Sequence, residues 1–343
     1  MTFVEQSRQF GSRLLFVMLM TAIAVFFSEK VYWYPQGYVL WGLLMFYAVP
    51  VYACLWAIEH FRVQRLSALI LVAALFAFLV EGVITPVIYE AGLFDPVMPF
   101  YFVGWHGWLS IIWGWYYLRV WLVRAEWRKL LLASTLFGSF WGAWSITFWL
   151  PEQVADWPQL EALGEAVTRH TQWPTLAFGL YTLTFTGMLV VSHWVLGQGG
   201  WQRTFTLSNV EKGLLIAILI FFFATLALPV SPLGIFKLVA LLGVLFLALR
   251  SNRQIESAGS LLTELGGVVK PLALLGLLAM PAMATAVYAL ALELEWSEAT
   301  IRALLDSITL LQVVIGGMSL LWAWVVTLWP AKPPVDNTQI DLD

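Results

Sequence analysis

Long runs of apolar residues recur along the whole chain, and short polar connections separate them. An α-helix needs about 20 mostly apolar residues to cross the hydrocarbon core of a bilayer. The pattern predicts about ten such spans, at residues 12–30, 37–58, 67–89, 101–123, 130–150, 173–196, 213–230, 233–250, 270–292 and 304–329. The expected fold is therefore an all-α, polytopic transmembrane helix bundle that forms one domain over residues 1–330.

The basic residues indicate how the chain is oriented in the membrane. Lys and Arg concentrate in alternate connections, such as those with Arg62 and Arg65 and with Arg124 and Arg128, and the opposite connections are rich in Asp and Glu. Cytoplasmic loops carry such a basic excess. We expect both termini to be cytoplasmic, the protein to be a multi-pass protein of the inner (plasma) membrane, and the polar residues 331–343 to form a disordered cytoplasmic tail.

Composition supports the membrane as the main partner. Hydrophobic residues make up 61% of the chain and charged residues only 11%, against about 25% charged residues in soluble domains. A net charge of -3 gives no indication of nucleic-acid binding. Cys54 is the only cysteine, so the chain has no internal disulfide. No metal site is expected, and the sequence assigns no cofactor.

Two spans contain similar heptapeptides. Residues 109–115 read LSIIWGW, and residues 318–324 read MSLLWAW. Together with other matches at an offset of about 200 residues, they predict that 12–123 repeats in parallel as 213–329, with 130–196 between the repeats. Chance similarity among Leu- and Trp-rich helices is the alternative.

Glu81 is an ionisable residue inside the third predicted span. Such a group costs several kcal/mol in hydrocarbon and is a candidate for function. Thr85 and Tyr89 follow at i+4 and i+8 and extend a polar stripe on the same helix face. Pro86 removes a backbone hydrogen bond and predicts a kink at that point.

His106 lies at a similar depth in the fourth predicted span, between two glycines. Consecutive antiparallel helices are usually neighbours, so we expect Glu81 and His106 to form an acid–base or ligand-coordinating pair. A hydrogen bond that only ties two helices together is the alternative. Six further side chains on these two spans are predicted to bind substrate: Thr85, Tyr89, Trp105, Ser110, Trp113 and Tyr117.

Three classes of function remain open. The first is a membrane-embedded enzyme for a lipid, an isoprenoid or another apolar small molecule, which the Glu81–His106 pair favours. The second is a secondary transporter of a small molecule, which the span count and the predicted repeat favour. The third is an accessory subunit that binds pigment, quinone or lipid in a larger complex, consistent with the 20 tryptophans and the absence of a known catalytic motif. The oligomeric state is left open.

Overall fold

The computed structural model describes residues 3–30, 37–150, 173–198, 205–255 and 261–329. These residues form helices and no strand, which confirms the predicted all-α fold class. The predicted tail, residues 331–343, lies outside the described residues.

The first half of the chain contains regular α-helices that pass into short segments of different winding. Its helices are α1 Phe3–Val25, η1 Phe26–Lys30, α2 Gly37–His60, α3 Leu66–Leu79, η2 Val80–Ile84, η3 Pro86–Tyr89, α4 Val97–Phe102, η4 Val103–Tyr117, α5 Leu118–Arg124 and α6 Trp127–Thr147. Of the short segments, η1, η2 and η4 are π-helical and η3 is a 3₁₀ turn.

The second half has the same character. Its helices are α9 Thr175–Gln198, α10 Asn209–Phe222, η6 Phe223–Ala227, α11 Leu228–Val230, α12 Gly234–Ile255, α13 Leu261–Glu264, α14 Pro271–Leu274, η7 Leu275–Leu278, α15 Ala279–Glu293 and α16 Glu298–Leu328. Here η6 is π-helical and η7 is a 3₁₀ turn.

Within the described residues, nine helices are long and apolar enough to cross a membrane. Each coincides with a predicted span to within a few residues, and together they indicate a multi-pass membrane protein. The remaining predicted span, 101–123, falls in the unbroken helical stretch 97–124 formed by α4, η4 and α5. Its many Trp, Tyr and Gly residues and one His give that stretch a lower hydropathy than the other nine.

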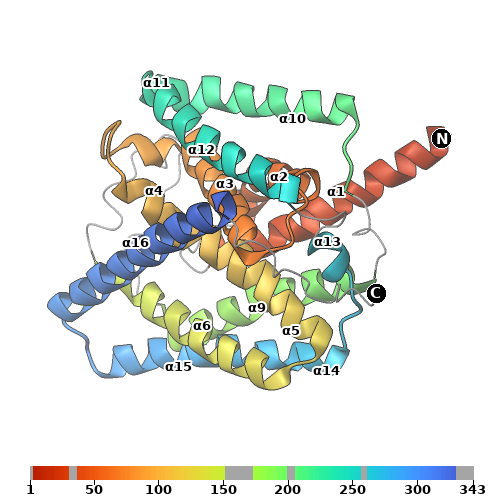
Figure 1. The fold of residues 1–343 in the computed structure, drawn as a ribbon. Helices are drawn as coiled ribbons and strands as arrows, with labels where there is room; N and C mark the ends of the chain where they lie inside the picture. Colours follow the sequence, from red (N-terminus) through yellow and green to blue (C-terminus); the bar gives the residue numbers. More distant parts are fainter. Residues whose placement is uncertain (1–2, 31–36, 151–172, 199–204, 256–260, 330–343) are drawn as a thin grey trace, which may run out of the picture.

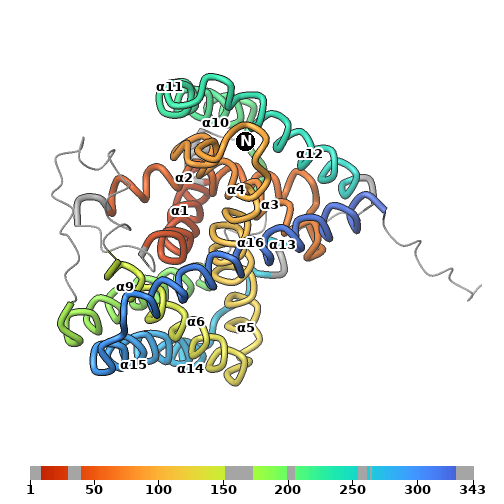
Figure 2. Tube along the Cα trace, turned by 90° about the vertical axis from the view of Figure 1, so that its left-hand side faces the viewer, coloured from red at the N-terminus to blue at the C-terminus, as the bar shows by residue number. Residues whose placement is uncertain are grey.

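The helices pack in three layers. Figure 2 shows α10, α11 and α12 along the top, α6, α9, α14 and α15 below, and α1 to α4 with α16 between them. In Figure 1, α11 and the α15–α16 connection lie on the left-hand side, whereas α13, α14 and the α5–α6 turn lie on the right. The connections thus fall on two opposite sides of the bundle.

Helix α3 is the centre of the bundle. Every residue from 67 to 79 is buried, and the helix packs against α2, α12, α16 and η4. A helix that is apolar all round is stable only when other helices surround it. Because α3 leads directly into η2, this burial fixes the place of Glu81 in the interior.

Close approach of two backbones positions η4 against α16. A Cβ on Gly104 would lie 2.0 Å from the carbonyl oxygen of Gln312, and one on Gly316 would lie 1.9 Å from that of Phe100. Real Cβ atoms do not approach backbone atoms so closely, so only glycine fits at these two crossings. The crossing holds the segment that carries His106.

A buried arginine ties the other end of the same helix to its neighbours. The Arg119 side chain is fully buried. It donates hydrogen bonds to the carbonyl oxygens of Leu265 (2.9 Å), His193 (2.6 Å) and Gly267 (2.8 Å). These contacts join α5 to α9 and to the segment after α13.

Candidate functional site

Glu81 and His106 are in direct contact in the structure. His106 Nε2 lies 2.5 Å from Glu81 Oε1. The residues are 7% and 2% exposed, respectively. A charge in this low-dielectric interior is stable only with a partner, and each residue provides one for the other. We call the two residues the Glu81–His106 pair.

The local backbone around Glu81 departs from an α-helix. Glu81 lies in the π-helical segment η2, and the chain then leaves the helix at Thr85, with φ −113° and ψ 104°. That extended conformation is the one preferred before a proline, so the break predicted at Pro86 occurs at the preceding residue. Thr85 Oγ1 donates to Val80 O (3.1 Å) and to Glu81 Oε2 (3.2 Å). Both carboxyl oxygens of Glu81 therefore have a partner.

His106 lies in η4, a π-helical segment of 15 residues, and four aromatic rings surround its imidazole. The centroid distances are 5.2 Å to Trp105 and 6.1 Å to Phe102, both stacked. They are 6.3 Å to Tyr47 and 6.4 Å to Phe76. Segments of π-helix are rare and occur frequently at functional sites.

The second nitrogen of the imidazole takes no part in the contact with Glu81. His106 Nδ1 is buried and has no hydrogen-bond partner among the described residues. A neutral imidazole carries one N–H and one lone pair. When Nε2–H donates to the Glu81 carboxylate, Nδ1 keeps its lone pair and can accept a proton.

A second carboxyl group lies beside the pair. Glu29, in the π-helical segment η1, accepts a hydrogen bond from the Tyr47 hydroxyl. The sequence indicates Glu29 only as a residue at the end of a span, and it does not single out Tyr47. The available signal is a phenol in the middle of an apolar run, because a hydroxyl there needs a hydrogen-bond partner.

Thr85 and Trp105 contact the pair, and two other predicted substrate-binding residues serve neighbouring parts of the fold. Trp105 also donates from Nε1 to Ser28 O (3.3 Å). Tyr89 donates to Gly82 O (2.7 Å), and Ser110 Oγ lies 2.6 Å from Ser28 Oγ. Tyr89 and Ser110 thus stabilise the segments that carry Glu81 and Glu29.

The remaining two predicted residues lie farther along η4. Trp113 meets Trp121 edge to face at 5.7 Å between centroids, and Tyr117 stacks on Trp121 at 5.4 Å. In an α-helix both would be close to the face of His106. The i→i+5 hydrogen bonding of η4 changes that register.

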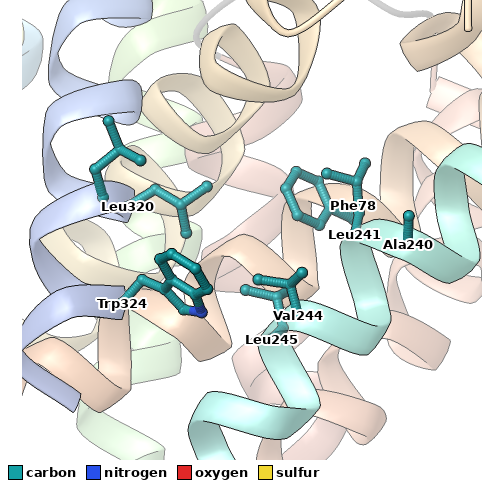
Figure 3. Close-up of a pocket in the computed structure, with 8 residues that line it drawn as sticks. Phe78, Ala240, Leu241, Val244, Leu245, Leu320 and Trp324 are labelled. Atoms are coloured by element: carbon teal, nitrogen blue, oxygen red, sulfur yellow. The ribbon is translucent and has the colours of Figure 1, made fainter. Parts of the chain in front are cut away.

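Two cavities lie beside α12, and neither is lined by Glu81 or His106. The first, of about 270 Å³, is lined by Phe78 of α3, by Ala240, Leu241, Val244 and Leu245 of α12, and by Leu320, Leu321 and Trp324 of α16 (Figure 3). The second, of about 360 Å³, shares Ala240 and Leu241 with it and extends to Asp95 and Lys237. Phe78, in the lining of the first cavity, lies one helical turn before Glu81.

Within the described segments, no group of three or more His, Cys, Asp or Glu side chains is placed to hold a metal ion. The side chains of the Glu81–His106 pair themselves offer a carboxyl group and an imidazole, both of which can exchange protons. No protein-family model, curated protein or solved structure matches this chain.

Proposed function

We propose that this protein is a membrane-embedded enzyme in which the Glu81–His106 pair moves a proton to or from an apolar substrate. The observation that carries the proposal is the buried contact of 2.5 Å between His106 Nε2 and Glu81 Oε1, together with the unpartnered Nδ1 on the other side of the ring. A base oriented by a second group is the common arrangement in general acid–base catalysis.

The two residues have separate roles in this proposal. Glu81, held by Thr85 on its second oxygen, orients the imidazole and stabilises the imidazolium that forms. His106 accepts the substrate proton at Nδ1 and returns it later. The surrounding rings favour an apolar substrate with one polar group, such as a lipid or an isoprenoid.

The proposed topology has ten spans, the nine long apolar helices and the stretch 97–124, which is the fourth in chain order. Both termini are cytoplasmic, and the protein lies in the plasma membrane. The alternation of basic and acidic connections supports it, and so does the distribution of connections on two sides of the bundle (Figure 1). A reporter fused after Asp343 should be cytoplasmic, and one inserted near Glu161 should be on the other side. Finding both on the same side would contradict this topology.

The second candidate is a proton-coupled secondary transporter. The interrupted helices favour it, because transporters bind substrates and ions where membrane helices depart from regular winding. The predicted repeat of 12–123 and 213–329 belongs to this candidate. It requires that Trp113 and Trp322 occupy equivalent positions after rotation about an axis near the membrane normal.

One experiment separates the two candidates. Cells producing the wild-type protein or Glu81→Gln would be compared by mass spectrometry of their extracted lipids after growth in deuterated water. An enzyme that moves a proton changes the amount or the deuterium content of at least one lipid species, and Glu81→Gln abolishes that change. Identical lipids in both cultures, combined with proton flux in vesicles that depends on Glu81, would favour the transporter.

A further inference from the structure

The Tyr47 hydroxyl links a partly exposed carboxyl group to the buried pair. Tyr47 is 3% exposed and donates its hydrogen bond to Glu29. Glu29 is only partly buried, at the end of the helical stretch formed by α1 and η1. Along this line of residues, exposure falls from Glu29 to Tyr47 and stays low at the pair.

On its other side, Tyr47 faces the pair. Its ring centroid is 6.3 Å from that of His106 and 5.9 Å from that of Phe76. Tyr47 thus contacts the partly exposed Glu29 through its hydroxyl, and its ring lies near the imidazole that contacts the buried Glu81.

Two other hydroxyl groups, those of Thr85 and Tyr101, could also exchange a proton with the pair. Thr85 is already bonded to Val80 O and to Glu81. Tyr101, from α4, packs edge to face against Trp105, whose ring is stacked on His106, and it provides the competing route that an experiment must exclude.

From this geometry we infer that Glu29 and Tyr47 form a proton relay between the Glu81–His106 pair and the membrane face opposite the N-terminus. The inference deepens the proposed function and rests on the pair being an acid–base site. In the outward direction, the His106 imidazolium first gives its Nε2 proton to the Glu81 carboxylate, so that one N–H bond breaks and one O–H bond forms. In the second step, Tyr47 gives its hydroxyl proton to the Glu29 carboxylate and receives the proton of the Glu81 carboxylic acid. Two O–H bonds break and two form, and Glu29 then releases the proton to water. The inward direction is the reverse.

The relay can be measured without knowing the substrate. The full-length protein would be reconstituted in vesicles, and the solution pH would be changed rapidly on one side. Protonation of the pair would be followed by the infrared bands that disappear in Glu81→Gln. We expect the wild-type pair to respond first to the side opposite the N-terminus.

The test variant is Tyr47→Phe, which keeps the ring and removes the hydroxyl. We expect it to slow protonation of the pair about a hundredfold, the lower range for a positioned proton donor. The matched control is Tyr52→Phe, because Tyr52 lies on the same helix and donates to another carboxylate, Glu211, at 3.0 Å. That control should leave the rate unchanged.

Three outcomes would overturn the relay: an unchanged rate in Tyr47→Phe, an equal loss in Tyr52→Phe, or a loss in Tyr101→Phe alone. If Tyr47→Phe does not fold, Glu29→Gln provides the test, because it leaves every aromatic ring in place and should slow the same step. The two proposals can fail separately. If the vesicle measurement shows the relay but the lipid assay is negative, the enzyme proposal is refuted and the relay is not.

Discussion

Replacing His106 by leucine tests how strongly the buried pair is coupled. The change removes the nitrogen that lies 2.5 Å from Glu81 Oε1 and leaves a buried carboxyl group with Thr85 as its remaining side-chain partner. Removing one partner of a buried pair typically costs about 3–5 kcal/mol of folding free energy. We expect a loss in that range for His106→Leu.

The double variant Glu81→Leu/His106→Leu separates the interaction from the cost of stranding a charge. Replacing both members of a buried pair by apolar residues is often neutral or stabilising, so the double variant should be more stable than His106→Leu alone. A hydrogen bond to a charged group contributes about 1.5–3 kcal/mol. The coupling free energy from the four-protein cycle should lie at or above that range.

The assay is reversible unfolding of the purified protein in detergent, with the free energy of unfolding measured for each of the four proteins. Glu298 and Arg302 provide a matched control, because their contact is 2.7 Å long and their side chains are 62% and 48% exposed. An exposed helical pair should show a coupling of only about 0.3–0.5 kcal/mol. A coupling as small as this at the Glu81–His106 pair would refute the reasoning that led to the site.

Three further predictions use the same unfolding assay. Gly104→Ala should lower the free energy of unfolding by about 1–3 kcal/mol, because its Cβ would meet the Gln312 backbone. Gly187→Ala has open space around the new Cβ and should instead stabilise by about 0.5–1 kcal/mol; a similar loss in both would contradict the packing argument. Arg119→Met should cost at least about 3 kcal/mol, because three carbonyl groups lose a charged donor. Lys237→Met should cost about 1.5–3 kcal/mol and increase hydrogen exchange near η3, because Lys237 donates to the carbonyl oxygens of Ile88, inside η3, and of Gly92, just beyond it. Unchanged exchange there would count against this role.

The long apolar helices were predictable because each depends on the sum of about 20 side chains, so single exceptions change little. The contact between Glu81 and His106 was predictable for a related reason. It needed only the rule that consecutive antiparallel helices are neighbours and a count of residues from the end of each span. Both features survive an error of a few residues in the helix boundaries.

The directions in which the side chains of η4 point depend on contacts between segments that are distant in the sequence. The local sequence gives no information about these contacts. Gly114 in η4 has Phe27 so close that a Cβ would lie 2.3 Å from its ring. Ser110, predicted to face substrate, instead pairs with Ser28. An α-helical projection cannot predict these directions, because the winding of η4 is π-helical and follows from packing against η1 and α3.

Two buried basic residues in the same stretch of helix differ in how their nitrogens are bonded. Arg119 lies in regular α-helix and directs its donors at three fixed carbonyl groups, so its hydrogen bonds serve to hold segments together. His106 lies in π-helix and has one nitrogen bonded to Glu81 and the other unpartnered among the described residues. Glu29 and Glu81 lie in π-helical segments as well. Glu29, Glu81 and His106 thus each lie where the chain departs from α-helical winding, whereas the purely structural donor Arg119 does not.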